Sequence, residues 1–225
     1  IFMKLAVELI TPTQVVLVRV LFGFIPVLIY ALVTKSLRIE HLKLWPHFLV
    51  MSLLATAIYY YAFVKATAVL PSGVAGAISG TIPLTSFIFA SLFLNKLENI
   101  TRSRFLGVLI GFAGILFIAN PFNQTQASSI EGVLYMLFGS ISVGASFVYA
   151  RKFLSDVAIK SQALTTYQLG FALIILFAVT DLDNILLITQ DTQVFSAAAV
   201  GLGLFGTGFA FIAYYYLVKN LGAVK

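Results

Sequence analysis

Arg19 is a charged side chain inside an apolar stretch, Pro12 to Val33, about two helical turns from where the stretch begins. An arginine that faced lipid there would cost about 2.5 kcal/mol or more, so its side chain must face other helices or reach outward. The guanidinium could bind an anionic or zwitterionic substrate. It could equally hold helices together near one end of the span, and the sequence leaves both interpretations open.

Two tyrosine runs, Tyr59–Tyr61 and Tyr214–Tyr216, offer aromatic rings with a hydroxyl. Such rings suit a binding cavity, and they equally mark a membrane interface. Because successive helical residues turn by about 100°, we expect roughly one tyrosine of each run to face inward. We take Tyr59, Tyr60 and Tyr214 as cavity candidates.

Uncharged polar residues inside other apolar stretches could line a cavity or form hydrogen bonds between helices. They are Ser79, Thr81, Ser142, Ser146, Tyr149 and Gln168. Gly80 and Pro83 join these candidates because a proline removes a backbone hydrogen bond, kinks the helix and frees carbonyls toward a cavity.

Several kinds of chemistry are missing from the sequence. It contains no cysteine, and its two histidines, His41 and His47, lie in or beside a polar loop. The only Asp or Glu in a predicted span is Glu131, at the outer end of the span 130–153, so an intramembrane acid–base site or proton relay has no carboxylate to use. We therefore predict no catalytic residue, no metal site and no cofactor, and expect a protein that is not an enzyme.

The composition explains where these residues must lie. Hydrophobic residues make up 60% of the chain and charged residues 10%, against roughly 25% charged in soluble domains. The apolar residues form blocks near the ~20 residues that a helix needs to cross a bilayer. The blocks are not alternating strands of about ten residues, which excludes an outer-membrane barrel. The sequence predicts an all-α polytopic membrane protein.

Seven complete spans are predicted. Their approximate ranges are 12–33, 45–64, 72–94, 104–119, 130–153, 164–179 and 195–217. Small residues at helical spacing, including Gly76, Gly107, Gly111 and Gly114, predict faces where another helix can approach closely.

Basic residues alternate between loops. They gather in segments 34–44, 95–104, 151–160 and 219–225, whereas the opposite loops hold Lys4, Lys65 and most of the acidic residues. The positive-inside rule places the basic loops in the cytoplasm, and the net charge of +6 then reflects topology and not nucleic-acid binding. We expect a multi-pass membrane protein with these basic loops on the cytoplasmic side.

The chain also contains a weak internal repeat. A shift of 151 positions takes Thr13 to Leu164 and Tyr59 to Ala210, at either side of the linker-like segment 120–129. The equivalent helices run in opposite directions by the charge pattern. Inverted repeats of this kind are typical of transporters.

Three motifs, taken with their order, resemble those of the EamA family of the drug/metabolite transporter superfamily. They are Pro12 with Arg19, the segment from Ala66 through Pro71 to Pro83, and the segment from Glu98 through Arg104 to Gly107. The resemblance covers the whole chain.

The resemblance implies a bundle of two inverted five-helix repeats, of which this chain would hold helices two to eight. The first repeat would occupy residues 1–121, without most of its first helix, and the second residues 130–225, without its last two helices. It implies a permease or exporter that moves a small metabolite by alternating access through a cavity between the repeats. A nucleotide-sugar or sugar-phosphate antiporter and a non-transporting scaffold or receptor remain as alternatives. Oligomeric state, substrate, direction and energy coupling stay open.

Overall fold

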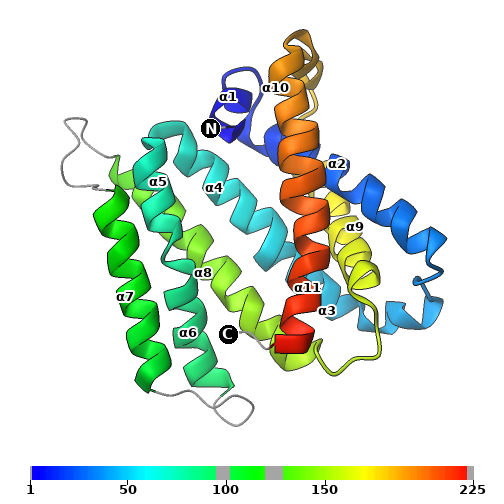
Figure 1. Cartoon of the computed structure of the whole chain (residues 1–225). Coiled ribbons are helices and arrows are strands. Elements are labelled where there is room, and N and C mark those ends of the chain that lie inside the picture. The colour runs from blue at the N-terminus through cyan, green and yellow to red at the C-terminus, as the bar shows by residue number, and fades with distance from the viewer. Residues whose placement is uncertain (1, 95–101, 120–128, 222–225) are drawn as a thin grey trace.

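The computed structural model describes residues 2–94, 102–119 and 129–221, and in these ranges every regular element is a helix. The first part of the chain forms α1 (Phe2–Val7), α2 (Pro12–Val33), η1 (Ile39–Leu44), α3 (Trp45–Ser52), η2 (Leu53–Ala57), α4 (Ile58–Val69), α5 (Ser72–Ser79), α6 (Ile82–Phe93) and α7 (Arg102–Ala119). The second part forms α8 (Ile130–Phe153), α9 (Ser161–Val179), η3 (Ile185–Gln190), α10 (Thr192–Ser196), η4 (Ala197–Phe209) and α11 (Ala210–Leu221). Figure 1 shows the continuous rod of α10, η4 and α11 crossing α2 and α9, with α5 to α8 on the other side of α4.

Six helical segments within the described residues are long and apolar enough to cross a membrane. They are Pro12–Val33, Ile39–Val69, Ser72–Phe93, Ile130–Phe153, Ser161–Val179 and Thr192–Leu217. The seventh predicted span forms helix α7, in which the apolar helix found by the same criteria is the shorter Phe105–Gly114. The prediction of an all-α polytopic membrane protein is confirmed.

Two spans differ in detail from the prediction. The span expected at 45–64 begins earlier, since η1 turns the polar segment after Arg38 into helix that continues through α3, η2 and α4. The span expected at 72–94 is interrupted at Gly80 and Thr81, as the proline predicts, because Pro83 has no N–H for the preceding turn. Pro83 instead occupies the first turn of α6, where a missing donor costs nothing.

Helix α2 begins where its sequence predicts. Thr11 is the N-cap, its hydroxyl accepts from the Gln14 N–H, and the Gln14 side chain accepts from the Thr11 N–H in return. Two otherwise unpaired donors at the helix start are thereby satisfied. Pro12 is the first helical residue, which fits its fixed φ angle.

Helices α2 and α9 lie antiparallel. The Gln14 amide, at the start of α2, donates at 2.8 Å to the carbonyls of Asp181 and Asp183, just beyond the end of α9. At the opposite end, Gln162 donates to the Ser36 hydroxyl at 2.9 Å, and Tyr167 donates to the Arg38 carbonyl at 2.8 Å. The first turns of the two helices therefore sit at opposite ends of the bundle.

The tightest approach joins α2 to η4. A Cβ added at Gly23 would lie 2.9 Å from the Gly203 carbonyl oxygen, and one added at Gly203 would lie 2.7 Å from the Phe22 Cβ. These distances are too short for carbon atoms, so both glycines are needed for the two backbones to touch. We call this contact the glycine seam, formed by Gly23 and Gly203.

The glycine faces selected from the sequence pack differently. At Gly76, Gly107, Gly111 and Gly114, an added Cβ would meet nothing within 4 Å in the described part of the chain. The prediction of close packing at these positions is therefore wrong for the described residues. Helical spacing shows which glycines share a face, but it does not show which face has a neighbour.

The glycine seam yields a stability prediction. Gly203→Ala should lower the thermal unfolding midpoint because the new methyl group forces α2 and η4 apart, an overpacking effect of about 1–3 kcal/mol. Gly76→Ala is the matched control, with open space at its Cβ and a gain in helix propensity, so it should leave the midpoint unchanged or raise it. Equal midpoints for the two variants in detergent would contradict the seam.

Candidate functional site

The Arg19 side chain lies inside the bundle, against helices α4 and η4. It is 6% exposed. Its Nε donates to the Thr207 hydroxyl at 2.8 Å, and its Nη2 donates to the Gly206 carbonyl at 2.9 Å. The Tyr60 ring lies flat beneath it, with Cζ 3.6 Å from the ring centroid. Three contacts thus hold the guanidinium in one place, and we call Arg19, Tyr60, Gly206 and Thr207 the arginine cluster.

The positive charge of this cluster is incompletely compensated. A desolvated cation over an aromatic ring gains about 2 kcal/mol, which offsets part of the burial cost. However, no Asp or Glu among the described residues forms an ion pair with Arg19, and its buried Nη1 has no hydrogen-bond partner in that part of the chain. Buried charges in proteins normally have a partner of opposite charge. This arginine therefore has unused capacity to bind an anion.

A second buried polar group joins α9, η2 and α11. Gln168 is fully buried, its amide nitrogen donates to the Thr56 hydroxyl at 2.8 Å, and its carbonyl oxygen accepts from the Tyr215 hydroxyl. Gln168, Thr56 and Tyr215 form what we call the glutamine cluster. Both ends of the amide have a partner, and the cluster carries no charge to offer a substrate.

The two clusters lie on either side of the middle of the bundle, and Thr56 and Tyr60 are only four positions apart, about 6 Å along the continuous helix of η2 and α4. Arg19 is in the second turn of α2 and Gln168 is in the second turn of α9, and these helices are antiparallel. Thr207 and Tyr215 are separated by eight positions on one continuous helix, which corresponds to about 12 Å along its axis.

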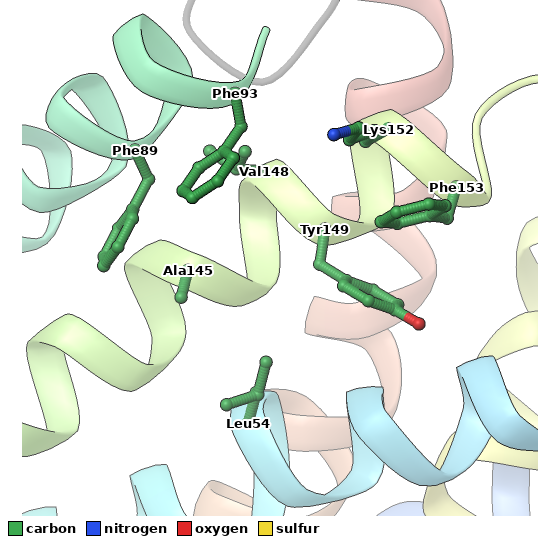
Figure 2. A pocket seen from close by; sticks show the side chains of 8 residues that line it. All are labelled: Leu54, Phe89, Phe93, Ala145, Val148, Tyr149, Lys152 and Phe153. Carbon is green, nitrogen blue, oxygen red and sulfur yellow. The ribbon is translucent and has the colours of Figure 1, made fainter.

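A cavity of about 300 Å³ lies between helix α8 on one side and η2 and α6 on the other. Its wall is formed by Leu54, Phe89, Phe93, Ala145, Val148, Tyr149, Lys152 and Phe153 (Figure 2). The lining is apolar and aromatic except for Tyr149 and Lys152. Figure 2 shows the Lys152 amine directed toward Phe93, whose ring centroid lies 5.7 Å from Nζ.

Tyr149 connects this cavity to the start of α3. Its hydroxyl lies 2.7 Å from His47 Nδ1, and the His47 ring stacks on Phe153 with centroids 5.5 Å apart. The hydroxyl therefore has a partner on α3, while the tyrosine ring forms part of the cavity wall. Of the residues selected from the sequence, Tyr149 lines this cavity.

The other selected residues are distributed through the bundle. Ser79, Thr81 and Ser146 donate to carbonyls of their own chain segment three residues earlier, and Ser142 donates to the Leu54 carbonyl on η2 at 2.7 Å. Tyr59 packs against Tyr60 and Phe63. The Tyr214 hydroxyl is buried without a partner in the described part of the chain. Gly80 and Pro83 flank the interruption between α5 and α6.

Sequence reasoning missed Thr56, Gly206 and Thr207, and from the run Tyr214–Tyr216 it selected Tyr214, whereas the structure bonds Tyr215 to Gln168. A signal for two of them was present, because the repeat shift of 151 positions takes Thr56 onto Thr207. A threonine in an apolar stretch usually bonds within its own helix, and this common behaviour conceals one that accepts from a distant side chain.

The sequence of this chain is similar to that of known transporters. The family model described as "EamA-like transporter family" matches residues 1–120 and 130–225. The chain belongs to the EamA-like transporter family. With its apolar helices, this makes it a multi-pass membrane protein and points to a transporter and not an enzyme.

Curated relatives of this EamA-family chain carry transporter names. It is 30% identical over 152 residues to an uncharacterized inner membrane transporter, YedA, of Escherichia coli, a match that covers 67% of this chain and 47% of the relative. It is 22% identical over 217 residues to an uncharacterized transporter of Archaeoglobus fulgidus, covering 96% of this chain and 74% of the relative. It is 22% identical over 227 residues to the uncharacterized transporter YoaV of Bacillus subtilis, covering 99% and 75%. The chain thus matches about half the length of YedA and three quarters of the other two.

The arginine cluster can be tested through the ring beneath the guanidinium. Tyr60→Phe keeps the aromatic face and should destabilise the protein little, whereas Tyr60→Leu removes the cation–π contact and should cost about 2 kcal/mol. Thermal unfolding in detergent measures both. Tyr61→Leu is the control, because it removes a tyrosine ring from the neighbouring, half-buried position. If Tyr60→Leu is no less stable than Tyr61→Leu, the ring does not support Arg19.

Proposed function

We propose that this chain forms part of a bacterial inner membrane permease for small metabolites that carry an anionic group, including zwitterions such as amino acids. The observation that carries the proposal is the buried Arg19 guanidinium without an acidic partner in the described structure. Family membership and the names of the relatives support transport itself.

Arg19 is suited to recognise a carboxylate. A guanidinium presents a planar fork of donors that matches two oxygens, and such charge-assisted bonds are about twice as strong as neutral ones. One donor, Nη1, has no partner in the described residues, and the bonds to Thr207 and Gly206 are to neutral oxygens. A substrate anion would therefore replace weak acceptors with a strong one. The competing interpretation is that Arg19 only fastens α2 to η4.

The cavity beside α8 is proposed as part of the substrate path. About 300 Å³ lies at the lower limit of small-molecule sites, and an apolar, aromatic wall suits the carbon skeleton of a metabolite. In the proposed division into repeats at 1–121 and 130–225, Leu54 and Phe89 come from the first repeat and Tyr149 from the second. A cavity between repeats is where transporters with inverted repeats bind their substrates.

Alternating access between inverted repeats is the proposed mechanism. The two ranges matched by the family model and the antiparallel arrangement of α2 and α9 support it. Rocking of one repeat against the other would expose the cavity first to one side of the membrane and then to the other.

The role of Arg19 is tested by flux through proteoliposomes that contain the full-length protein. Solutes from a panel of amino acids, organic anions and nucleotide sugars that move with the unaltered protein are then measured with Arg19→Gln and Arg19→Lys. Arg19→Gln should abolish flux, and Arg19→Lys should retain a fraction, since a point charge replaces the fork.

Lys65→Gln is the matched control because it removes the same charge from a half-exposed position, and it should transport normally. If folded Arg19→Gln transports at the unaltered rate, Arg19 is a packing residue. If no solute moves with the unaltered protein, the permease proposal itself is wrong.

The proposed orientation places the loop after α8 in the cytoplasm and the loop after α9 outside. The chain has no cysteine, so single substitutions at the exposed Asp156 and Gln190 can report on each side. In intact cells, a membrane-impermeant maleimide should label Gln190→Cys and spare Asp156→Cys. The reverse pattern would contradict the positive-inside assignment.

A further inference from the structure

The arginine and glutamine clusters have the same plan with the two repeats exchanged. In the arginine cluster, Arg19 and Tyr60 come from the first proposed repeat and Thr207 from the second. In the glutamine cluster, Gln168 and Tyr215 come from the second and Thr56 from the first. Each cluster therefore consists of a long polar donor, a tyrosine, and a threonine supplied by the opposite repeat.

The two threonines occupy equivalent positions. Thr56 and Thr207 are 151 positions apart, which is the shift that relates the repeats, and both are 0% exposed. Each accepts a 2.8 Å hydrogen bond from the other repeat, from Gln168 and from Arg19 respectively. The threonines thus correspond in sequence, burial and bonding, whereas their partners do not, since the same shift pairs Arg19 with Gly170 and Gln168 with Leu17.

Both threonines also lie in widened helical turns. Thr56 is in the π-helical segment η2, and Thr207 is in the π-helical segment η4, where its hydroxyl donates to the Leu202 carbonyl at 2.9 Å. Segments of this kind are rare and frequently occur at functional sites. The threonines thus sit where each rod-like helix can change its course.

We propose, on the basis of the alternating-access permease above, that the two clusters are paired latches, one on each side of the middle of the bundle, that close the transport path toward its two ends. The arginine cluster fastens α2 to η4 near the start of α2, and the glutamine cluster fastens α9 to η2 near the start of α9. Release of one latch opens its end while the other stays closed. Both latches are engaged in this structure.

The chemical difference between the latches gives them different triggers. The arginine latch holds a charge with a free donor, so an anion that binds Arg19 competes with Thr207 and Gly206 for the guanidinium. The glutamine latch is neutral, with its amide nitrogen bonded to Thr56 and its amide oxygen to Tyr215. It is therefore released by movement of the helices and not by direct competition from a charged substrate.

Cysteine accessibility in proteoliposomes of the full-length protein tests the proposal. Val20 and Leu169 are each 0% exposed and directly follow Arg19 and Gln168, so Val20→Cys and Leu169→Cys report on the two latches. Each reporter is combined with Thr207→Val or Thr56→Val, which keep the side-chain shape and remove the hydroxyl. The measured quantity is the rate of reaction with a membrane-impermeant maleimide added from either side.

Thr207→Val should increase the labelling of Val20→Cys about fivefold and leave Leu169→Cys unchanged or slower, because a lost hydrogen bond of ~1 kcal/mol shifts the equilibrium by that factor. Thr56→Val should increase the labelling of Leu169→Cys and leave Val20→Cys unchanged or slower. This increase should be seen with maleimide added from the side of the membrane opposite to that which labels Val20→Cys. Thr207→Ser and Thr56→Ser retain the hydroxyl and should restore the unaltered rates.

Equal acceleration of both reporters by either valine variant would show general loosening and overturn the latch proposal, as would no acceleration at all. These outcomes are separate from failure of the proposed function, which is the absence of solute flux with the unaltered protein. If solute flux is measured but both cysteine reporters respond alike to each valine variant, the latch proposal alone is wrong. If each valine variant accelerates only its own reporter but no solute flux is measured, the permease proposal alone is wrong.

Discussion

The burial of one positive charge constrains the centre of this bundle. Arg19 cannot face lipid cheaply, and it reaches no carboxylate in the described structure, so neutral groups must compensate for the water it has lost. Tyr60 on α4 supplies a ring face, and Thr207 and Gly206 on η4 supply oxygen atoms. Arg19 itself is on α2, so all three groups come from other helices. The position of α2 against η4 is therefore fixed by electrostatics as well as by packing.

The glycine seam makes this arrangement possible. The guanidinium reaches η4 only because the backbones of α2 and η4 touch at Gly23 and Gly203, one turn beyond Arg19 on α2. A bulkier residue at either glycine would move the carbonyl of Gly206 away from the guanidinium. Packing and charge compensation at this seam are thus interdependent, and in the proposed mechanism a substrate anion that binds Arg19 would weaken the contact between α2 and η4.

Much of the fold follows from the sequence because lipid imposes simple rules. Apolar length and backbone satisfaction predict the helices, and the Thr11 cap and Pro83 mark where two of them begin or break. The site is harder to predict, since it depends on which helix faces which. Arg19 can be identified from the sequence because a charged side chain that faces lipid is energetically costly. Thr56 and Thr207 acquire a role only in the folded bundle, where η2 packs beside α9 and η4 packs beside α2. Gly76 of α5 and the glycines of α7 show the converse, because they share helix faces in the sequence and a Cβ added at any of them meets no neighbour in the described structure.

If the Arg19 guanidinium is the counter-charge for the substrate anion, as we propose, the anion must contact it directly. Solid-state NMR of the protein in lipid, with ¹⁵N-labelled arginine, observes this group directly, since Arg19 lies over the Tyr60 ring and its resonance should be displaced by that ring. Addition of a transported anion should shift the Arg19 side-chain nitrogen signals, whereas the neutral amide of the same compound should leave them unchanged. A transported anion that leaves the Arg19 signals unmoved would contradict the account.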